Sequence, residues 1–278
     1  MPWLGSVDGS CPYCRRGAEN LCIAPTFTGW DRDGGYADFC VVDEGFAYRL
    51  PTTVDDEHAA PLLCAGIIGY RAWRSADVPI GGRLGIYGFG GSAHITAQIA
   101  LHMGQRVHVL TRGEHNQELA RSLGVDSLAV RRTRRRNRST EPSCSLRPGS
   151  SSPSPSVALD RGATLAIAGI WLSDVPTLNY ERELFEERRL RSVTANTRQD
   201  GEEFLALAER FRITPTTVGY PMGRAPEALA DLAHGRFGGA SCPAQQLTGI
   251  PAERHRLLGG AGSDHHQPCF SSSAAGRR

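Results

Sequence analysis

The stretch Leu84-Gly85-Ile86-Tyr87-Gly88-Phe89-Gly90-Gly91-Ser92-Ala93 is a short apolar run that ends in glycines and leads into a helical pattern. Its glycine spacing, with Ala93 as the permitted variant of the third glycine, is typical of a dinucleotide-binding turn. Gly88 allows a sharp turn, Gly90 lets a pyrophosphate approach the backbone, and Ala93 allows close packing of helix on strand. We expect a cofactor here; the alternative is an ordinary tight strand-to-helix turn.

The residues after this turn complete a strand-helix-strand unit. Ile95, Ile99 and Met103 share one helical face, Gly104 follows as a cap, and residues 106–110 form the next expected strand. A carboxylate at the end of that strand would bind the ribose hydroxyls of NAD, but Thr111-Arg112-Gly113 stands there instead. Thr111 and Arg112 favour NADP over NAD, because a guanidinium pairs with the extra phosphate; the alternative is a solvated arginine.

A second candidate site lies in the first residues, where Asp8, Cys11, Cys14 and Cys22 follow one another at short spacings on a loop with several glycines. Three thiolates and one carboxylate oxygen at such spacings can close a tetrahedron around zinc. The alternatives are unrelated free cysteines, or a redox pair of Cys11 and Cys14. The redox pair lacks the preceding strand and following helix expected of it.

Local patterns predict the remaining elements. The clearest strand of residues 27–50 is Gly34–Val42, and an apolar helix runs from Ala59 to Trp73 with Cys64 near its start. A lone cysteine in such a helix is typically a small buried hydrophobe. No element is evident from about Ser241 onward. Further expected elements are a helix at 116–123, strands at 164–170, 190–195 and 214–220, a helix opened by a capping box at 200–203, and a helix at 225–234.

Residues 128–156 break the alternation of strands and helices with seven arginines, one glutamate and a Ser/Pro tract. One interpretation is a disordered basic linker that touches nucleic acid or an acidic surface. Another is an out-of-frame reading of a GC-rich gene, because a doubly wound sheet should place a strand and helix here and the pattern resumes near Val157. An independent DNA sequence showing one continuous frame would refute that hypothesis.

Composition narrows the class of protein. The chain has 278 residues and a formal charge of +2, and all its Lys/Arg positions are arginine. No apolar run of membrane-spanning length and no secretory leader occurs, so we expect no membrane partner and a cytoplasmic location. Clustered arginine without interleaved aromatics fits nucleic-acid binding poorly, so no nucleic acid is expected. Eight cysteines in such a chain favour metal ligation over disulfides.

Together these motifs resemble the zinc-dependent medium-chain alcohol dehydrogenases over roughly residues 1–127 and 157–240. The cysteine loop resembles that family's structural zinc lobe, with Asp8 where a first cysteine is usual. Ala60-Pro61-Leu62-Leu63-Cys64-Ala65-Gly66 resembles the segment that carries a cysteine ligand of the catalytic zinc. Gly88, Gly90, Gly91, Ser92 and Ala93 match the family's cofactor turn, and Arg198, in Asn196-Thr197-Arg198, resembles an arginine that reaches the cofactor's phosphates.

The resemblance implies an α/β fold: a Rossmann-like doubly wound parallel sheet at 60–198, with remnants of a β-rich GroES-like catalytic domain at 1–59 and 199–240 and a disordered tail at 241–278. It also implies zinc, NADP or NAD, an alcohol or aldehyde substrate, and a homo-oligomer in an intact relative. Family members carry two more catalytic zinc ligands in an upstream portion, so we expect a truncated member with impaired turnover. The alternatives are a non-catalytic zinc- and nucleotide-binding relic and a zinc-free quinone reductase-like oxidoreductase.

Overall fold

The structure, a computed structural model, describes residues 2–37, 39–130, 158–170, 172, 174–175, 177–237 and 239–244. These residues belong to one unit, Met1–Ala244, while a second unit, Gln245–Arg278, lies outside the described part of the chain.

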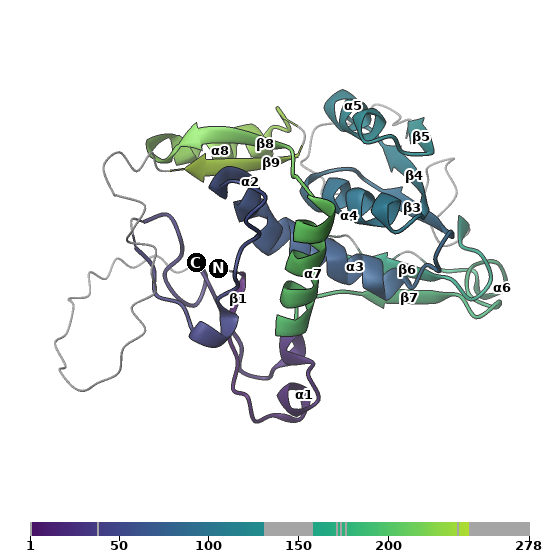
Figure 1. Ribbon diagram of the computed structural model, residues 1–278. Helices are drawn as coiled ribbons and strands as arrows, with labels where there is room; N and C mark the ends of the chain where they lie inside the picture. The colour runs from purple at the N-terminus through teal and green to yellow at the C-terminus, as the bar shows by residue number, and fades with distance from the viewer. Residues whose placement is uncertain are drawn as a thin grey trace. The chain divides into compact units, whose positions relative to one another are not determined.

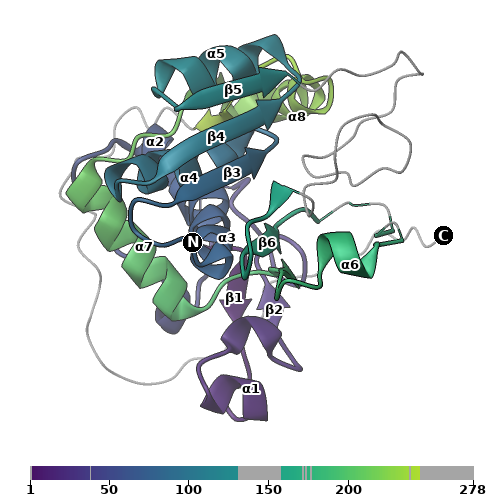
Figure 2. The same cartoon turned by 90° about the vertical axis from the view of Figure 1, so that its right-hand side faces the viewer.

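The glycine-rich stretch lies at the edge of a three-stranded parallel sheet, in which β3 (Arg83–Tyr87) pairs with β4 (Arg106–Thr111) and β4 pairs with β5 (Ser127–Val130). The connecting helices are α4 (Gly91–His102) and α5 (Glu114–Ser122), and Figure 2 shows the three strands side by side. Alternate strand residues face the helices, as expected for pleated strands. The buried cluster between them comprises Leu84, Phe89, Ala97, Ala100, Val107, Val109 and Ala120. The expected strand-turn-helix-strand unit is confirmed.

A separate parallel pair consists of β6 (Thr164–Ile167) and β7 (Arg189–Ser192), with the short helix α6 (Tyr180–Glu183) between them in sequence. In Figure 1 this pair lies beside α3 (Ile67–Ala76). In a continuous doubly wound sheet, a further strand would lie in space between β3 and β6 and pair with both. The described residues contain no such strand. Of the aberrant stretch 128–156, only 128–130 are described, at the end of β5, so both hypotheses about its remainder concern undescribed residues.

A helical core lies against this sheet. Helix α2 (Asp56–Pro61) continues into a π-helical turn, η3 (Leu62–Gly66), and then into α3, while α7 (Arg198–Phe211) packs across α3 and α4. Figure 1 shows α7 running from the N-terminal residues near α1 (Pro12–Arg15) up to α4. The core between these helices consists of Leu62, Leu63, Ile67, Tyr70, Ile95, Ile99, Phe204, Leu205, Ala208 and Ile213. Cys64 therefore lies on a turn that is in contact with α2, α3, α4 and α7.

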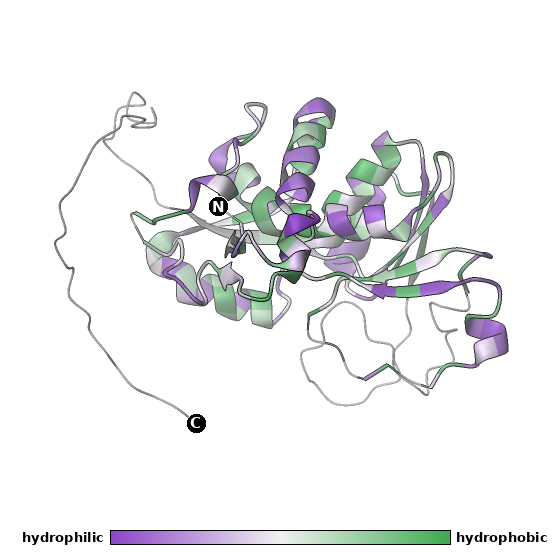
Figure 3. Cartoon of the chain, turned by 90° about the horizontal axis from the view of Figure 1, so that it is seen from below, coloured by the Kyte–Doolittle hydropathy of each residue, from purple (hydrophilic) through white to green (hydrophobic). Residues whose placement is uncertain are grey.

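Helices α3, α5, α7 and α8 (Ala225–Ala233) are amphipathic, whereas α4 is largely apolar, and Figure 3 shows both hydrophilic and hydrophobic residues along the helices. Helix α7 begins earlier than its sequence suggested. Thr197, not Asp200, is the N-cap, and Asp200 is the third helical residue of a capping box whose two side-chain bonds are both present.

None of the helices in the described part of the chain has the length and apolarity needed to cross a membrane.

The N-terminal residues form a small lobe. Strand β1 (Leu4–Ser6) pairs antiparallel with β2 (Thr26–Phe27), and between them lie α1 (Pro12–Arg15) and the 3-10 turn η1 (Glu19–Leu21). A further 3-10 turn, η2, follows at Glu44–Phe46.

The strand expected at Gly34–Val42 is wrong, because the described residues of that segment form no strand. Its apolar side chains are exposed, Phe39 by 89% and Val41 by 91%. A strand is stabilised only by a partner that accepts its backbone hydrogen bonds, and no described strand pairs with this segment.

The C-terminal part forms a parallel β-α-β unit of β8 (Thr217–Pro221), the 3-10 turn η5 (Met222–Arg224), α8 (Ala225–Ala233) and β9 (Ala240–Ala244). Strand β9 corrects the expectation that no element occurs from about Ser241. The composition there is atypical of a strand, but pairing along the whole length of β8 supplies backbone bonds that composition does not reveal. The expected tail therefore begins after Ala244 at the earliest, outside the described residues.

Candidate functional site

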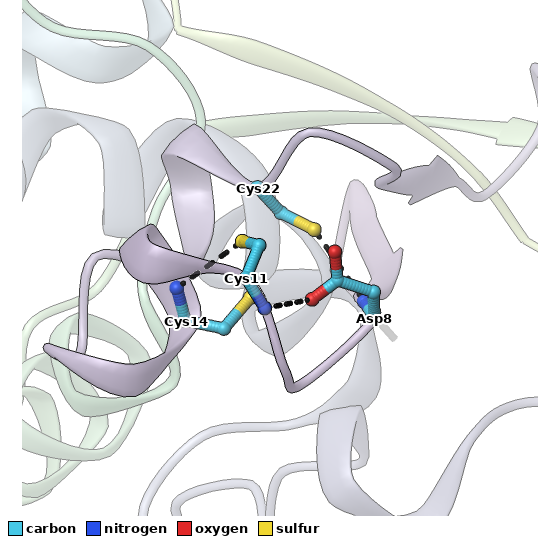
Figure 4. A group of neighbouring side chains, drawn as sticks. All are labelled: Asp8, Cys11, Cys14 and Cys22. Carbon is cyan, nitrogen blue, oxygen red and sulfur yellow. Dashed lines mark hydrogen bonds between the residues drawn. The ribbon is translucent and has the colours of Figure 1, made fainter.

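The four residues of the cysteine loop converge on one point, as Figure 4 shows. Their ligand atoms, three Sγ atoms and a carboxylate oxygen of Asp8, all lie within 4.8 Å of one another. Local geometry creates this arrangement. Cys11 caps the four-residue helix α1 that carries Cys14, and Asp8 Oδ1 accepts hydrogen bonds from the backbone N–H groups of Ser10 (2.8 Å) and Cys11 (2.9 Å). The predicted ligands are therefore assembled by short-range contacts.

Hydrogen bonds to these ligands shift their ionisation. The N–H groups of Cys11 and Ser10 lower the pKa of Asp8 to about 2, so its carboxylate is charged. Burial and the neighbouring thiols raise the pKa of Cys14 to about 12. Burial alone would raise the pKa of Cys11, but N–H groups including that of Cys14 lower it overall. Cys14 resists ionisation in the absence of a metal, and a bound metal would compensate the negative charge of its thiolate.

The glycine turn has the geometry that a pyrophosphate requires. Gly88 has a φ of +90°, which side-chain-bearing residues rarely adopt. Gly90 is the N-cap of α4, and a Cβ built on it would meet no atom within 4 Å, so the backbone is open to a ligand. The first amide groups of α4 have no partner within the helix and carry the positive end of its dipole. Glycines at these positions thus fit a dinucleotide.

The turn that carries Cys64 packs against the glycine turn. A Cβ on Gly91 would lie 3.7 Å from the Cβ of Ala65, the neighbour of Cys64, and 3.4 Å from the carbonyl oxygen of Gly239. The Cys64 side chain is exposed, yet the protein atoms around it hinder hydration of a thiolate and raise the pKa of the thiol. The structure thus brings together two segments that the sequence places more than twenty residues apart.

The end of β4 places the residues predicted to choose between NAD and NADP. Thr111 is buried, and Arg112 is exposed immediately after it. The Arg112 backbone carbonyl accepts a hydrogen bond from Gln117 Nε2 (3.1 Å), which ties this corner to α5.

Arg198, predicted to contact the cofactor, is paired with a carboxylate in this structure. Its Nε donates to Glu19 Oε1 at 2.8 Å, and its guanidinium lies 5.5 Å from the centre of the Phe46 ring. This ion pair joins the first residue of α7 to the cysteine lobe. To bind a phosphate, Arg198 would have to break its ion pair with Glu19.

Sequence reasoning missed His94, the fourth residue of α4. It is fully buried, with its Nδ1 3.1 Å from the Gly90 carbonyl oxygen and its Nε2 3.0 Å from the Thr216 amide nitrogen. The sequence contained a signal for its contact with Gly90, because a helical side chain leans back over the preceding turn and His94 follows Gly90 by four residues.

Comparison with known proteins assigns the family. Residues 1–52 match the alcohol dehydrogenase GroES-like domain. The chain is 51% identical over 242 residues to the probable alcohol dehydrogenase AdhA of Mycobacterium tuberculosis (strain CDC 1551 / Oshkosh), covering 87% of this chain and 70% of the relative. The chain belongs to the medium-chain alcohol dehydrogenase family. An alcohol dehydrogenase of Geobacillus stearothermophilus is 28% identical over 86% of this chain and 73% of its own length.

Solved structures of this family share the fold. The cinnamyl alcohol dehydrogenase SbCAD4 from Sorghum bicolor superposes with a TM-score of 0.69 at 20% identity, over 86% of this chain and 71% of its own. A Helicobacter pylori CAD complexed with NADP(H) gives 0.66 at 22% identity, over 85% and 71%. The acetophenone reductase of Geotrichum candidum, in complex with NAD, gives 0.69 at 22% identity, over 86% and 71%. The expected α/β class, a Rossmann-like sheet with a GroES-like portion, is thereby confirmed.

Proposed function

We propose that this alcohol dehydrogenase family member binds NAD(P), with a preference for NADP, at the turn Gly88–Ala93, and a structural zinc at Asp8, Cys11, Cys14 and Cys22. The observation that carries the proposal is the contact between the open glycine turn and the Cys64 turn. This contact brings the proposed nucleotide site next to the turn that carries Cys64, the proposed metal ligand, as hydride transfer between an alcohol or aldehyde and NAD(P) would require.

Each group of this chain has a defined part in such a reaction. The amide groups at the start of α4 bind the pyrophosphate, and the glycines leave room for it. Arg112 pairs with a ribose phosphate beyond the end of β4. When bound, zinc polarises an alcohol oxygen and the nicotinamide accepts the hydride. Cys64 contributes one thiolate toward that metal, and the raised pKa of its thiol means that without a metal it stays protonated.

Arg112→Glu is the substitution that tests the coenzyme preference. We expect about tenfold weaker NADPH binding with little loss for NADH, because a carboxylate repels the extra phosphate and accepts ribose hydroxyls. The measurement is a fluorescence titration of each coenzyme. Arg106→Glu, at the opposite end of β4, is the matched control and should change neither affinity. Equal effects on NADPH and NADH would contradict the preference, and wild-type protein that binds neither coenzyme would contradict the proposed site.

Metal content tests the structural site. We expect about one zinc per purified chain, as four ligands at one point imply, and a loss of most of it in Cys14→Ser. Cys40→Ser is the control, since Cys40 is exposed and outside the loop. Zinc is counted by mass spectrometry, with unfolding monitored after chelation. If Cys14→Ser keeps as much zinc as Cys40→Ser, the assignment fails.

We also propose that this 278-residue chain by itself turns over alcohols slowly or not at all. A catalytic zinc needs three protein ligands, and in the described residues only the Asp8 loop gathers three or more candidate donors. This favours, as the second candidate, a chain that binds zinc and nucleotide without catalysis. Zinc content distinguishes both from a zinc-free quinone reductase-like protein, and Cys64→Ser should leave the zinc content unchanged. Oxidation of simple alcohols at enzymatic rates by the purified chain would overturn the proposed impairment.

A further inference from the structure

His94 has two hydrogen-bond partners that together determine where its proton lies. The backbone N–H of Thr216 can only donate, so Nε2, 3.0 Å away, accepts. In the neutral ring the proton is then on Nδ1, which donates to the Gly90 carbonyl oxygen at 3.1 Å. The ring is fully buried, and this burial lowers its pKa and favours the neutral form.

The Gly90 carbonyl belongs to the peptide unit that enters α4. That oxygen also accepts the helical bond from the His94 backbone N–H at 3.1 Å, so two donors of one residue hold it. The peptide unit is planar and trans, and fixing the direction of the carbonyl therefore fixes the Gly91 N–H, which points the opposite way. This N–H is among the first amides of α4, which have no partner within the helix. The His94 ring thus orients an amide at the position where a pyrophosphate would bind.

The other nitrogen anchors this arrangement to a distant part of the chain. The carbonyl oxygen of Thr216 accepts from the Ala240 N–H at 2.9 Å, and a Cβ on Gly239 would lie 2.3 Å from that oxygen. Gly239 in turn is next to Gly91. The bond from Thr216 therefore ties the start of α4 to the β8–β9 unit and selects the tautomer that donates to Gly90.

Two other histidines, one in α4 and one directly after α8, show that this is no general property of histidine in or next to helices. His102 and His234 also place Nδ1 near the carbonyl oxygen four residues earlier, at 2.8 Å and 2.6 Å. Both bonds are exposed, whereas His94 is buried and bonded at both nitrogens.

We propose that His94 is a positioning residue of the pyrophosphate site: its Thr216-selected Nδ1–H tautomer holds the Gly90–Gly91 peptide so that the Gly91 amide faces the phosphates. This inference rests on the proposed nucleotide site. It assigns a role to a side chain that does not itself contact the nucleotide.

The test compares two amide replacements of His94. The amide of His94→Asn lies near the former Nδ1 and keeps a donor for Gly90, whereas the amide of His94→Gln lies near the former Nε2 and keeps only the bond with Thr216. Calorimetric titration with ADP-ribose and with adenosine separates the pyrophosphate contribution. We expect His94→Gln to bind ADP-ribose about tenfold more weakly and adenosine unchanged, and His94→Asn and the control His102→Asn to stay near wild type.

Stability distinguishes positioning from mere packing. The smaller Asn leaves the larger cavity, so His94→Asn should be the less stable of the two variants while binding ADP-ribose more tightly. Affinities that follow the order of stability instead would overturn the inference. Nitrogen NMR of labelled histidine in the wild-type chain gives a second measurement that needs no variant: a proton on Nε2 of His94 overturns it, and one on Nδ1 supports it. Wild-type protein that binds ADP-ribose, with His94→Gln binding equally well, refutes only the role of His94. Wild-type protein that binds neither ligand refutes the nucleotide site and this inference together.

Discussion

Replacing Asp200 with alanine is expected to lower the free energy of unfolding by about 3–5 kcal/mol, the usual cost of removing one partner of a buried ion pair. Asp200 Oδ2 accepts from the backbone N–H of Thr197 (2.8 Å), from its hydroxyl (2.9 Å) and from Arg71 Nη1. The side chains of Arg71 and Asp200 are only 17% and 6% exposed. The substitution therefore removes a helix cap and leaves a guanidinium charge with little access to water.

Arg71 makes this loss unusually costly. Among the described residues, its buried Nε has no hydrogen-bond partner, and the Asp200 carboxylate compensates its charge. A domain is stabilised by only about 5–15 kcal/mol, so we expect Asp200→Ala to be close to unfolding at ambient temperature.

Urea unfolding of matched variants tests this expectation. Glu202→Ala removes an exposed acid from the same helix and should change stability by no more than about 0.5 kcal/mol. Adding Arg71→Met to Asp200→Ala should recover part of the loss, since the uncompensated charge is then gone. If Asp200→Ala unfolds at the same urea concentration as Glu202→Ala, the pair is not important for stability.

The sequence was informative where neighbours in the chain determine the structure. The turn at Gly88–Ala93 depends on the φ of Gly88 and on adjacent amides, and the cysteine loop depends on a one-turn helix capped by Cys11. Both are short-range features, so spacing alone predicted their geometry. The ligand assignments themselves stay proposals.

Long-range contacts were not accessible in the same way. The bond from Thr216 to His94 spans 122 residues, and the pair of Glu19 with Arg198 spans 179. No periodicity encodes such contacts. The strand expected at Gly34–Val42 failed for the related reason that alternation indicates a strand only when a partner is present. The capping box was placed too late because the acidic run at 200–203 concealed the Thr197-x-x-Asp200 pattern.

Phe204→Ala should destabilise the chain by about 3–5 kcal/mol, because Phe204 is fully buried at the centre of the helical core. Its ring centre lies 5.9 Å from that of Tyr70, and its edge presses on Gly66, two residues after Cys64. The vacated space thus opens beside the Cys64 turn. Thermal unfolding measures the loss, and labelling of the Cys64 thiol should become faster. Phe211→Ala, a half-buried phenylalanine of the same helix, is the control and should cost clearly less.

Gly66→Ala gives a sharper test, because its effect on stability should have opposite signs in the wild-type and Phe204→Ala proteins. In the wild-type chain a Cβ on Gly66 would lie 2.4 Å from Phe204 Cε1, and the buried ring has no room to move, so Gly66→Ala should cost about 1–3 kcal/mol. In the Phe204→Ala background the added methyl group occupies the vacated space. Gly66 has helical φ and ψ angles (−66° and −55°), where alanine is favoured over glycine by about 1 kcal/mol. Gly66→Ala should therefore stabilise the Phe204→Ala protein. If it destabilises both proteins equally, Phe204 does not explain the glycine at position 66, and the packing of α7 against the Cys64 turn differs from that described here.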